Sequence, residues 1–269
     1  MKQPESPLNQ SVHRAIKILE YLAAADGPKD LAVISRSVQL NKSTVYRFLT
    51  TLEEDQYVYQ DAVTGRYSLG AKVTWLSAKF LEKNEIRNVA HPLLEALAVR
   101  TGETAHLGIL DGDEVCYIDK INGDQAVLMA SRVGIRMPLH CTALGKVLLA
   151  SEPVARWQQY VDEYGLPPRT ARTITHPNRF FEELETVRRQ RFAWDELENE
   201  DGIRCVAAPI RDASCEVVAA ISVSGWIITM TEARLRQITP WVCAAAEAIS
   251  ARLGCEATIE SKDPTTVEP

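Results

Sequence analysis

The clearest helical pattern in the chain lies at residues 41–54, NKSTVYRFLTTLEE. Four apolar residues recur at the spacing i, i+3, i+4, i+7 and so share one face of a helix: Val45, Phe48, Leu49 and Leu52. The opposite face carries hydroxyls, a phenol and cations, without an acidic residue before position 51. Asn41 is suited to cap this helix. The pattern is typical of a recognition helix in the major groove of DNA, although an ordinary amphipathic surface helix shares it.

Two shorter patterns before this segment complete a helix-turn-helix. Residues 11–24 carry one apolar stripe, and we expect Ser11 to cap that helix. A second short helix is expected at 30–37, and a tight turn at 38–40 leads into the recognition helix.

Two β-rich runs follow, at residues 57–59 and 66–69, on either side of a turn that contains Gly65. They predict a hairpin, which directly after a recognition helix is a wing. Arg66 is placed either to meet DNA phosphate or the minor groove, or only to support packing.

Residues 70–81 and 84–101 have further helical patterns. The first has an apolar stripe that needs a partner surface, which is either a second copy of the chain or the chain's own domain.

From residue 104 the pattern changes to strands grouped in hairpins. Strands are expected at 104–110, 114–121, 126–131, 202–212 and 216–225, and helices at 142–151, 153–163, 177–190 and, interrupted at Pro240, 231–253. Strands in hairpins with helices between them predict an antiparallel sheet covered by helices. The chain is therefore predicted to be an α+β protein of two domains.

Composition fits a cytoplasmic protein. The net charge of −6 argues at first against nucleic acid, but residues 1–85 carry 11 Lys/Arg against 10 Asp/Glu, so the acidic excess lies in the remainder. A locally basic face can still neutralise phosphates. No apolar run reaches the eighteen or so residues that a membrane span needs. The six cysteines lie far apart and are interpreted as reduced thiols.

Catalytic motifs are absent from the sequence, and we expect no cofactor and no metal site. One arrangement suggests a ligand. Ser222 and Ser224 are two apart, so on a strand both hydroxyls face the same side. They either contact a ligand or form hydrogen bonds within the protein. The start of the helix at Thr142 offers free backbone N–H groups, which suit a carboxylate.

Several segments together resemble the IclR-type bacterial transcriptional regulators over nearly the whole length. They are NKSTVYRFLTTLEE, YVYQD and GRYSLG in the first domain, and PLHCTALGKVLLA and GIRCVAAPIRDASCEVVAAISVSG in the second. The resemblance implies a winged helix-turn-helix at residues 8–70, a linker helix at 71–85, a GAF-like effector domain at 86–257 and a flexible tail at 258–269. It also implies a homodimer or homotetramer that binds a double-stranded DNA operator.

The resemblance also implies the site residues. DNA would be met by Lys42, Ser43, Thr44, Tyr46, Arg47 and Arg66. A small carboxylate, or an aromatic or sugar acid, would be bound by the backbone of Ala143 and Leu144, by the polar side chains of Asp195, Cys205, Ser222 and Ser224, and by apolar walls at Met129, Met137 and Ile203. Three residues depart from the family pattern: Gln56 and Cys215 stand where Gly is usual, and Trp226 where Pro is common.

Two other functions stay open on the sequence alone. The chain could be a thiol enzyme or hydrolase that acts on small acids through Cys205 and Asp195, but no base can be placed beside that thiol. It could also be an architectural DNA-binding protein whose second domain only oligomerises. We expect a ligand-responsive regulator and no enzyme.

Overall fold

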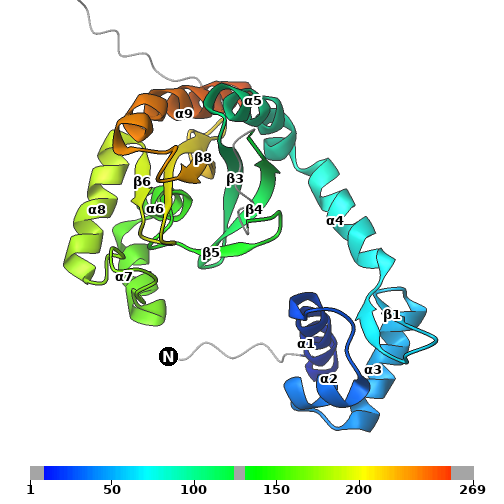
Figure 1. The fold of residues 1–269 in the computed structure, drawn as a ribbon. Coiled ribbons are helices and arrows are strands. Elements are labelled where there is room, and N and C mark those ends of the chain that lie inside the picture. Colours follow the sequence, from blue (N-terminus) through cyan, green and yellow to red (C-terminus); the bar gives the residue numbers. More distant parts are fainter. Residues whose placement is uncertain (1–8, 124–130, 256–269) are drawn as a thin grey trace, which may run out of the picture. The chain divides into compact units, whose positions relative to one another are not determined.

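The computed structural model describes residues 9–123 and 131–255 of the chain (Figure 1). The chain divides into two compact units, Met1–Lys83 and Asn84–Pro269. Among the described residues, none of the helices is both long and apolar enough to cross a membrane.

The first unit is a winged helix-turn-helix followed by one more helix. Its elements are α1 (Gln10–Ala24), α2 (Leu31–Ser37), α3 (Lys42–Glu54), β1 (Val58–Gln60), β2 (Tyr67–Leu69) and α4 (Ala71–Lys83). The strands β1 and β2 pair antiparallel as the predicted wing. The core residues are Ile18, Leu22, Ile34, Val45, Leu49, Val58 and Tyr67, so the predicted apolar face of α3 is the buried one.

Two local features of this unit differ from or extend the prediction. Asn9, and not Ser11, caps α1, because its Oδ1 accepts hydrogen bonds from the amides of Ser11 and Val12. The predicted stripe on α4 remains exposed, since no residue of that helix is buried.

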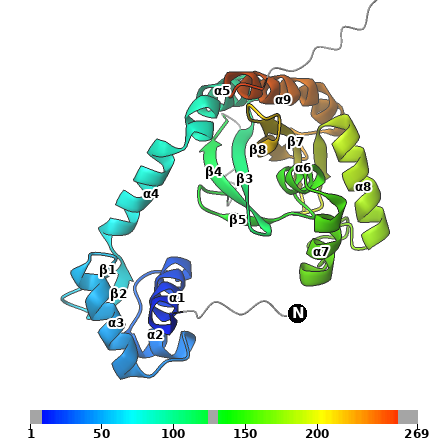
Figure 2. The same ribbon diagram turned by 180° about the vertical axis from the view of Figure 1, so that it is seen from behind.

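The second unit is a six-stranded antiparallel sheet with helices on both faces (Figure 2). The strand order is β5-β4-β3-β8-β7-β6. The strands are β3 (Thr104–Asp111), β4 (Glu114–Ile121), β5 (Arg136–Pro138), β6 (Ala193–Glu196), β7 (Ile203–Arg211) and β8 (Val217–Trp226). The helices are α5 (Glu85–Thr101), α6 (Ala143–Ser151), α7 (Val154–Tyr164), α8 (Pro177–Gln190) and α9 (Glu232–Arg252).

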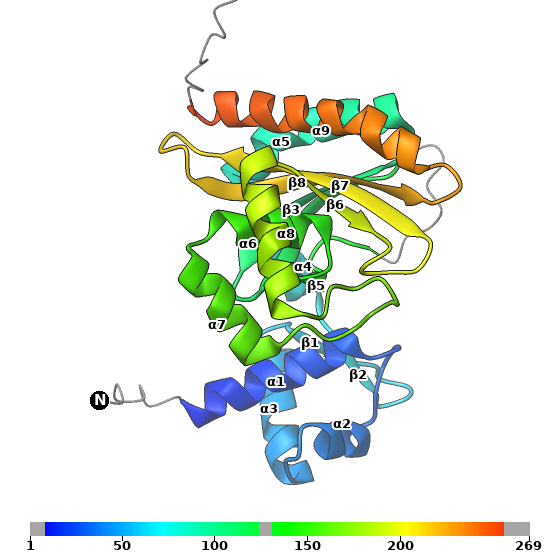
Figure 3. The same cartoon turned by 90° about the vertical axis from the view of Figure 1, so that its left-hand side faces the viewer.

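Figure 3 shows α5 and α9 on one face of the sheet and α6 on the other, and these faces are called outer and inner below. Contacts from the strands fix which residues belong to which face. Asp119 of β4 faces outward, because its Oδ2 lies 2.6 Å from Nδ1 of His91 in α5. Gly108 of β3 faces inward, because a Cβ there would lie 3.2 Å from the Leu144 side chain in α6.

Several sequence expectations for this unit need correction. β5 and β6 were not predicted, and the strand predicted at 126–131 falls largely outside the described residues. α9 is continuous through Pro240. The ring of Pro240 is exposed, so the carbonyl that loses its hydrogen bond at this turn is on the solvent side.

The interpretation of all six cysteines as reduced thiols is wrong. Cys215 and Cys255 form a disulfide, and Cys116, Cys141, Cys205 and Cys243 are free. The two bonded cysteines are 40 residues apart in sequence, yet the β7–β8 turn and the end of α9 bring them together. Sequence spacing alone does not reveal such a pairing.

Candidate functional site

Helix α3 presents the predicted DNA-binding face to solvent. Lys42, Ser43, Tyr46 and Arg47 are exposed, with 54% of Tyr46 accessible, whereas Thr44 is half-buried. Val45 and Leu49 on the opposite face have no accessible surface. The helix is therefore held by its apolar side while its cationic and phenolic side remains free.

Local hydrogen bonds decide which of these side chains are available to a partner. Oδ1 of Asn41 accepts from the Thr44 amide at 2.9 Å and from the Ser43 hydroxyl at 3.0 Å. These bonds confirm Asn41 as the helix cap and already use the Ser43 hydroxyl. Lys42 and Arg47 form no ion pair with another described residue, so both cations are available for phosphate or base contacts.

Arg66 on the wing is partly committed within the unit. Its Nε lies 3.5 Å from Oδ2 of Asp30, which precedes α2, and both side chains are about half exposed. The wing is also joined to the α1–α2 loop by a bridge between Lys29 and Tyr67. An exposed ion pair of this kind is weak and can exchange for a phosphate contact.

The inner face of the sheet of the second unit carries a row of polar side chains. Residues that pair directly across antiparallel strands share a face. Thr104 pairs with Ser224, Ser224 with Cys205, and Cys205 with Asp195, so one row crosses β3, β8, β7 and β6. In the next row on the same face, His106 pairs with Ser222.

We call Thr104, His106, Asp195, Cys205, Ser222 and Ser224 the inner polar patch. Five of these residues are buried, with at most 5% of their surface exposed, and the sixth, Cys205, is half-buried. The register brings together all four polar side chains that the resemblance implied. Thr104 and His106 were missed, because strand alternation pairs them with each other but does not show that β3 lies beside β8.

The start of α6 faces this patch. Thr142 is its cap, and its Oγ1 accepts from the Gly145 amide at 3.0 Å. The amides of Ala143 and Leu144 have no acceptor among the described residues, as expected for the first turn of a helix. Gly145 lets the first turn of α6 pack closely against the backbone of Leu139, since a Cβ at residue 145 would lie 2.5 Å from that backbone.

Electrostatic coupling supports that orientation. Burial, and after it the nearby Asp195 carboxylate, raises the pKa of the Cys141 thiol, just before α6, to about 12. Burial also raises the pKa of Tyr117 on β4, with Cys205, Asp195 and Cys141 adding to it. Tyr117 therefore belongs to the same surroundings, and no motif in the sequence indicated it.

The carboxyl group of Asp195 belongs to the patch and also fixes the loop that follows β6. Its Oδ1 accepts from the amides of Glu198 at 2.7 Å and Asn199 at 3.4 Å. Burial, with Glu198 nearby, raises its pKa to about 7 despite these hydrogen bonds. Lys146 of α6 anchors the same loop, donating to Glu198 at 2.6 Å and to Glu183 at 2.9 Å.

The free thiol of Cys205 is poorly suited to nucleophilic catalysis. Burial and then the Asp195 carboxylate raise its pKa well above that of an ordinary thiol, so the thiolate is strongly disfavoured. Within the described part of the chain, no group of three or more His, Cys, Asp or Glu residues could hold a metal ion.

The predicted apolar wall residues are only partly testable. Ile203 is buried, and its partner across the strands is Trp226, so both lie on the inner face beyond the row of Cys205 and Ser224. Met137 pairs with Val115 and packs against the core below α6. Met129 falls outside the described residues.

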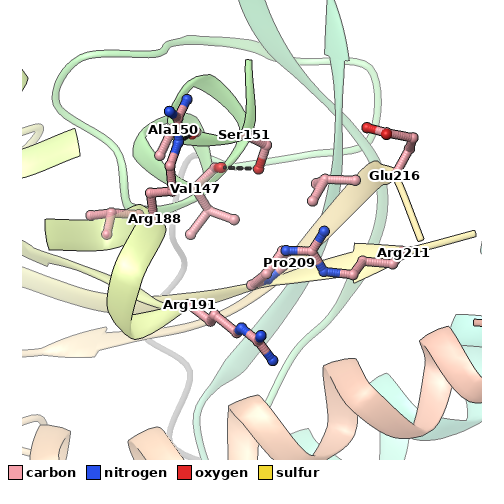
Figure 4. A pocket seen from close by; sticks show the side chains of 10 residues that line it. Val147, Ala150, Ser151, Arg188, Arg191, Pro209, Arg211 and Glu216 are labelled. Carbon is pink, nitrogen blue, oxygen red and sulfur yellow. Dashed lines mark hydrogen bonds between the residues drawn. The ribbon is translucent and has the colours of Figure 1, made fainter. Parts of the chain in front are cut away.

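A different cavity of about 210 Å³ lies near the end of β7 and is basic (Figure 4). Its lining includes Arg188, Arg191, Arg211 and Glu216, and none of the predicted effector residues. Arg188 is already bonded within the wall of this cavity, because its Nε donates to the carbonyl of Ala150, another lining residue, at 2.7 Å. This cavity is therefore separate from the inner polar patch.

Comparisons with known proteins agree over most of the chain. The model of the IclR helix-turn-helix domain matches residues 11–62, and that of the bacterial transcriptional regulator IclR C-terminal domain matches residues 78–251. The HTH-type transcriptional regulator XynR of Escherichia coli is 36% identical over 248 residues, which cover 92% of this chain and 98% of XynR. The transcriptional repressor IclR of the same organism is 30% identical over 247 residues, covering 91% and 90%.

Solved structures show the same architecture. The crystal structure of Thermotoga maritima IclR has 35% identity and a TM-score of 0.74, and the match covers 91% of this chain and 98% of that one. An IclR homologue from Microbacterium hydrocarbonoxydans, solved in complex with 4-hydroxybenzoate, has 23% identity and a TM-score of 0.80, over 91% of this chain and 99% of that one; at this identity it shows the fold alone.

The winged recognition helix and the two-faced sheet thus define a DNA-binding transcriptional regulator. The chain belongs to the IclR family of bacterial transcriptional regulators. It is a regulator and not an enzyme, which removes the thiol-enzyme alternative.

Proposed function

We propose that this regulator binds a double-stranded DNA operator as a homodimer or homotetramer, and that a small organic acid bound in the second unit changes its operator affinity. The acid's carboxylate binds the amides of Ala143 and Leu144 at the start of α6, and the rest of the molecule lies against the inner polar patch. The effector belongs to the small carboxylates, including aromatic and sugar acids.

The observation that carries this proposal is the alignment of the patch with a helix start. A helix N-terminus with two free amides attracts an anion, and a buried surface of hydroxyls opposite it needs hydrogen-bonding partners.

On the DNA side, the proposal assigns Lys42, Tyr46 and Arg47 to the major groove and Arg66 to the backbone beside it. Ser43 and Thr44 contribute near the helix cap, where the backbone approaches phosphate. The effector biases operator binding only by the difference between its affinities for the DNA-competent and incompetent arrangements.

Self-association is proposed from α4. Trp75, Leu76 and Phe80 are 52%, 43% and 55% exposed, and the helix buries no residue within the chain. A helix of 13 residues is marginal by itself and gains most of its stability from packing. A second copy of the chain supplies that packing. We expect wild type to sediment as a dimer or larger species and Leu76→Glu to sediment as a monomer.

The effector proposal is tested with purified full-length protein and labelled duplexes from its own genomic neighbourhood. Small carboxylic, aromatic and sugar acids are screened by thermal shift, and each hit is then titrated into the protein–DNA complex. We expect at least one acid to raise the melting temperature and to change operator affinity.

The matched variants are Ser222→Ala, in the patch, and Ser250→Ala, a buried serine on α9 whose Oγ accepts from the Arg211 amide. Ser222→Ala should weaken acid binding, and Ser250→Ala should affect only stability. Equal acid affinities in wild type and Ser222→Ala would contradict the assignment of the patch.

A further inference from the structure

Two side chains of the inner polar patch each hold one buried polar atom that has no hydrogen-bonding partner among the described residues. Thr104 is fully inaccessible and His106 is 2% exposed. The two atoms are Oγ1 of Thr104 and Nδ1 of His106, and neither has a partner within residues 9–123 and 131–255. A buried polar group left unpaired costs roughly 1–3 kcal/mol, so two of them side by side need an explanation.

The register places both unpaired atoms on the surface proposed for the effector. Thr104 and His106 are two apart on β3 and face inward, opposite Ser224 and Ser222 respectively. The patch is therefore wider than the family pattern implied, extending by one more strand toward β4. The aromatic ring of Tyr117 borders it there, with its centroid 5.0 Å from that of His106.

The imidazole at this end of the patch is neutral, and the cation beside it, Lys120, pairs with His106 across β3 and β4 and donates to the Ser131 carbonyl at 2.6 Å. Burial, and to a lesser degree Lys120, lowers the pKa of His106 to about 3, so the imidazole is uncharged at neutral pH. Its Nε2 lies 2.9 Å from the Ser131 hydroxyl, which can either donate or accept. Nδ1 therefore accepts a hydrogen bond when Nε2 carries the proton and donates one in the other tautomer. The Thr104 hydroxyl can likewise donate or accept.

We infer that Thr104 and His106 recognise a neutral polar group of the effector, so the cognate ligand is a hydroxy or keto acid and not an unsubstituted acid. This inference rests on the proposed function. The helix start takes the carboxylate, and the β3 pair takes a hydroxyl or carbonyl oxygen of the same molecule. A site built to pair with a hydroxyl rejects the analogue that lacks it, because its own buried groups are then left unpaired.

The test compares matched acids on full-length wild type and Thr104→Val, which replaces the hydroxyl by a methyl group of similar volume. Dissociation constants are measured by calorimetry for benzoate against 4-hydroxybenzoate, and for butyrate against its hydroxy and keto derivatives. In wild type, the best substituted acid should bind at least about tenfold more tightly than its unsubstituted counterpart. In Thr104→Val, that ratio should fall toward one.

A second readout needs no ligand. Thr239 on α9 is a matched buried threonine whose hydroxyl is satisfied, donating to the Leu235 carbonyl at 2.8 Å and accepting from Trp194 Nε1 at 2.9 Å. Thr239→Val should lower the melting temperature of the free protein. Thr104→Val should leave it equal or higher, because an unpaired buried hydroxyl is removed.

The outcomes separate the two claims. If wild type binds substituted and unsubstituted acids equally, or if Thr104→Val keeps the discrimination, the inference is wrong while the acid site itself stands. A fall in the melting temperature of Thr104→Val as large as that of Thr239→Val also overturns it, because the hydroxyl then has a protein partner. If no acid binds wild type, the proposed function fails and the inference fails with it.

Discussion

The disulfide between Cys215 and Cys255 gives a prediction whose magnitude follows from the structure. Its loop spans 40 residues, from the β7–β8 turn to the end of α9. Closing a loop of this length removes enough entropy from the unfolded chain to stabilise the fold by about 4 kcal/mol. Cys255→Ser should therefore lower the free energy of unfolding of the second unit by up to this amount.

The two cysteines should not be equivalent, because Cys215 has a positive φ of 60°. This left-handed conformation is disfavoured for residues with a Cβ by about 1 kcal/mol and is open to glycine. Cys215→Gly should thus be more stable than Cys215→Ser by about 1 kcal/mol, although both lose the cross-link. Gln56 has a φ of 64°, so Gln56→Gly should show a similar gain without any cross-link to lose.

Thiol titration and urea denaturation check this reasoning. Under non-reducing, denaturing conditions, four of the six cysteines should react, and all of them after reduction. Reduced wild type should unfold like Cys255→Ser, and Cys243→Ser, which removes a free thiol, should lose less than about 1 kcal/mol. Six reactive thiols without reductant, or a Cys255→Ser variant as stable as the oxidised wild type, would refute the account.

Three further predictions concern charged groups. Arg47→Ala should weaken operator binding by roughly 1–3 kcal/mol in fluorescence anisotropy, whereas Arg100→Ala in the second unit should not; unchanged affinity removes Arg47 from the interface. Lys146→Met should cost roughly 3–5 kcal/mol of unfolding free energy, because it leaves buried carboxylates without their cation. The exposed ion pair of Lys79 should be worth less than about 1 kcal/mol, so similar losses in Lys146→Met and Lys79→Met would contradict this. The folded pKa of Asp195, about 7, lies above its ordinary value of 3.8, so its contribution to stability should fall as pH rises between these values. Relative to Asp195→Asn, wild type should lose up to about 1.4 kcal/mol per pH unit in urea denaturation between about pH 5 and about pH 7, and a constant difference would count against it.

Much of the first unit was predictable because its signals are local. A few neighbouring residues are enough to determine each of these features: the apolar spacing of α3, the Asn41 cap and the turns around the wing. The error at the start of α1 has a simple cause. Asn9 and Ser11 are both good capping residues, and only the backbone geometry shows which side chain reaches the free amides.

The second unit was less predictable because its site is assembled from distant strands. Alternation correctly placed Ser222 and Ser224 on one face. It could not show that β3 pairs with β8, which is the pairing that brings Thr104 and His106 beside them. The short strand β6, which carries Asp195, has too few residues for a clear period and was missed.

The departures from the family pattern had physical meaning that the sequence only suggested. Gln56 and Cys215 stand where glycine is usual, and both have a left-handed backbone. Trp226 lies on the inner face and packs over Gly202, where a Cβ would lie 2.7 Å from its ring. At both positions, the residue that replaces the usual glycine has a positive φ. The same comparison could not show that Cys215 forms a disulfide with Cys255.

The most direct test of the central claim is the affinity of wild-type protein for its own upstream DNA, measured by fluorescence anisotropy at moderate salt with and without each acid found by thermal shift. Tight binding to one duplex over random DNA, with an affinity that changes in proportion to acid saturation, is the result we predict. Equal binding to all duplexes, or a specific affinity that no bound acid alters, would contradict the account.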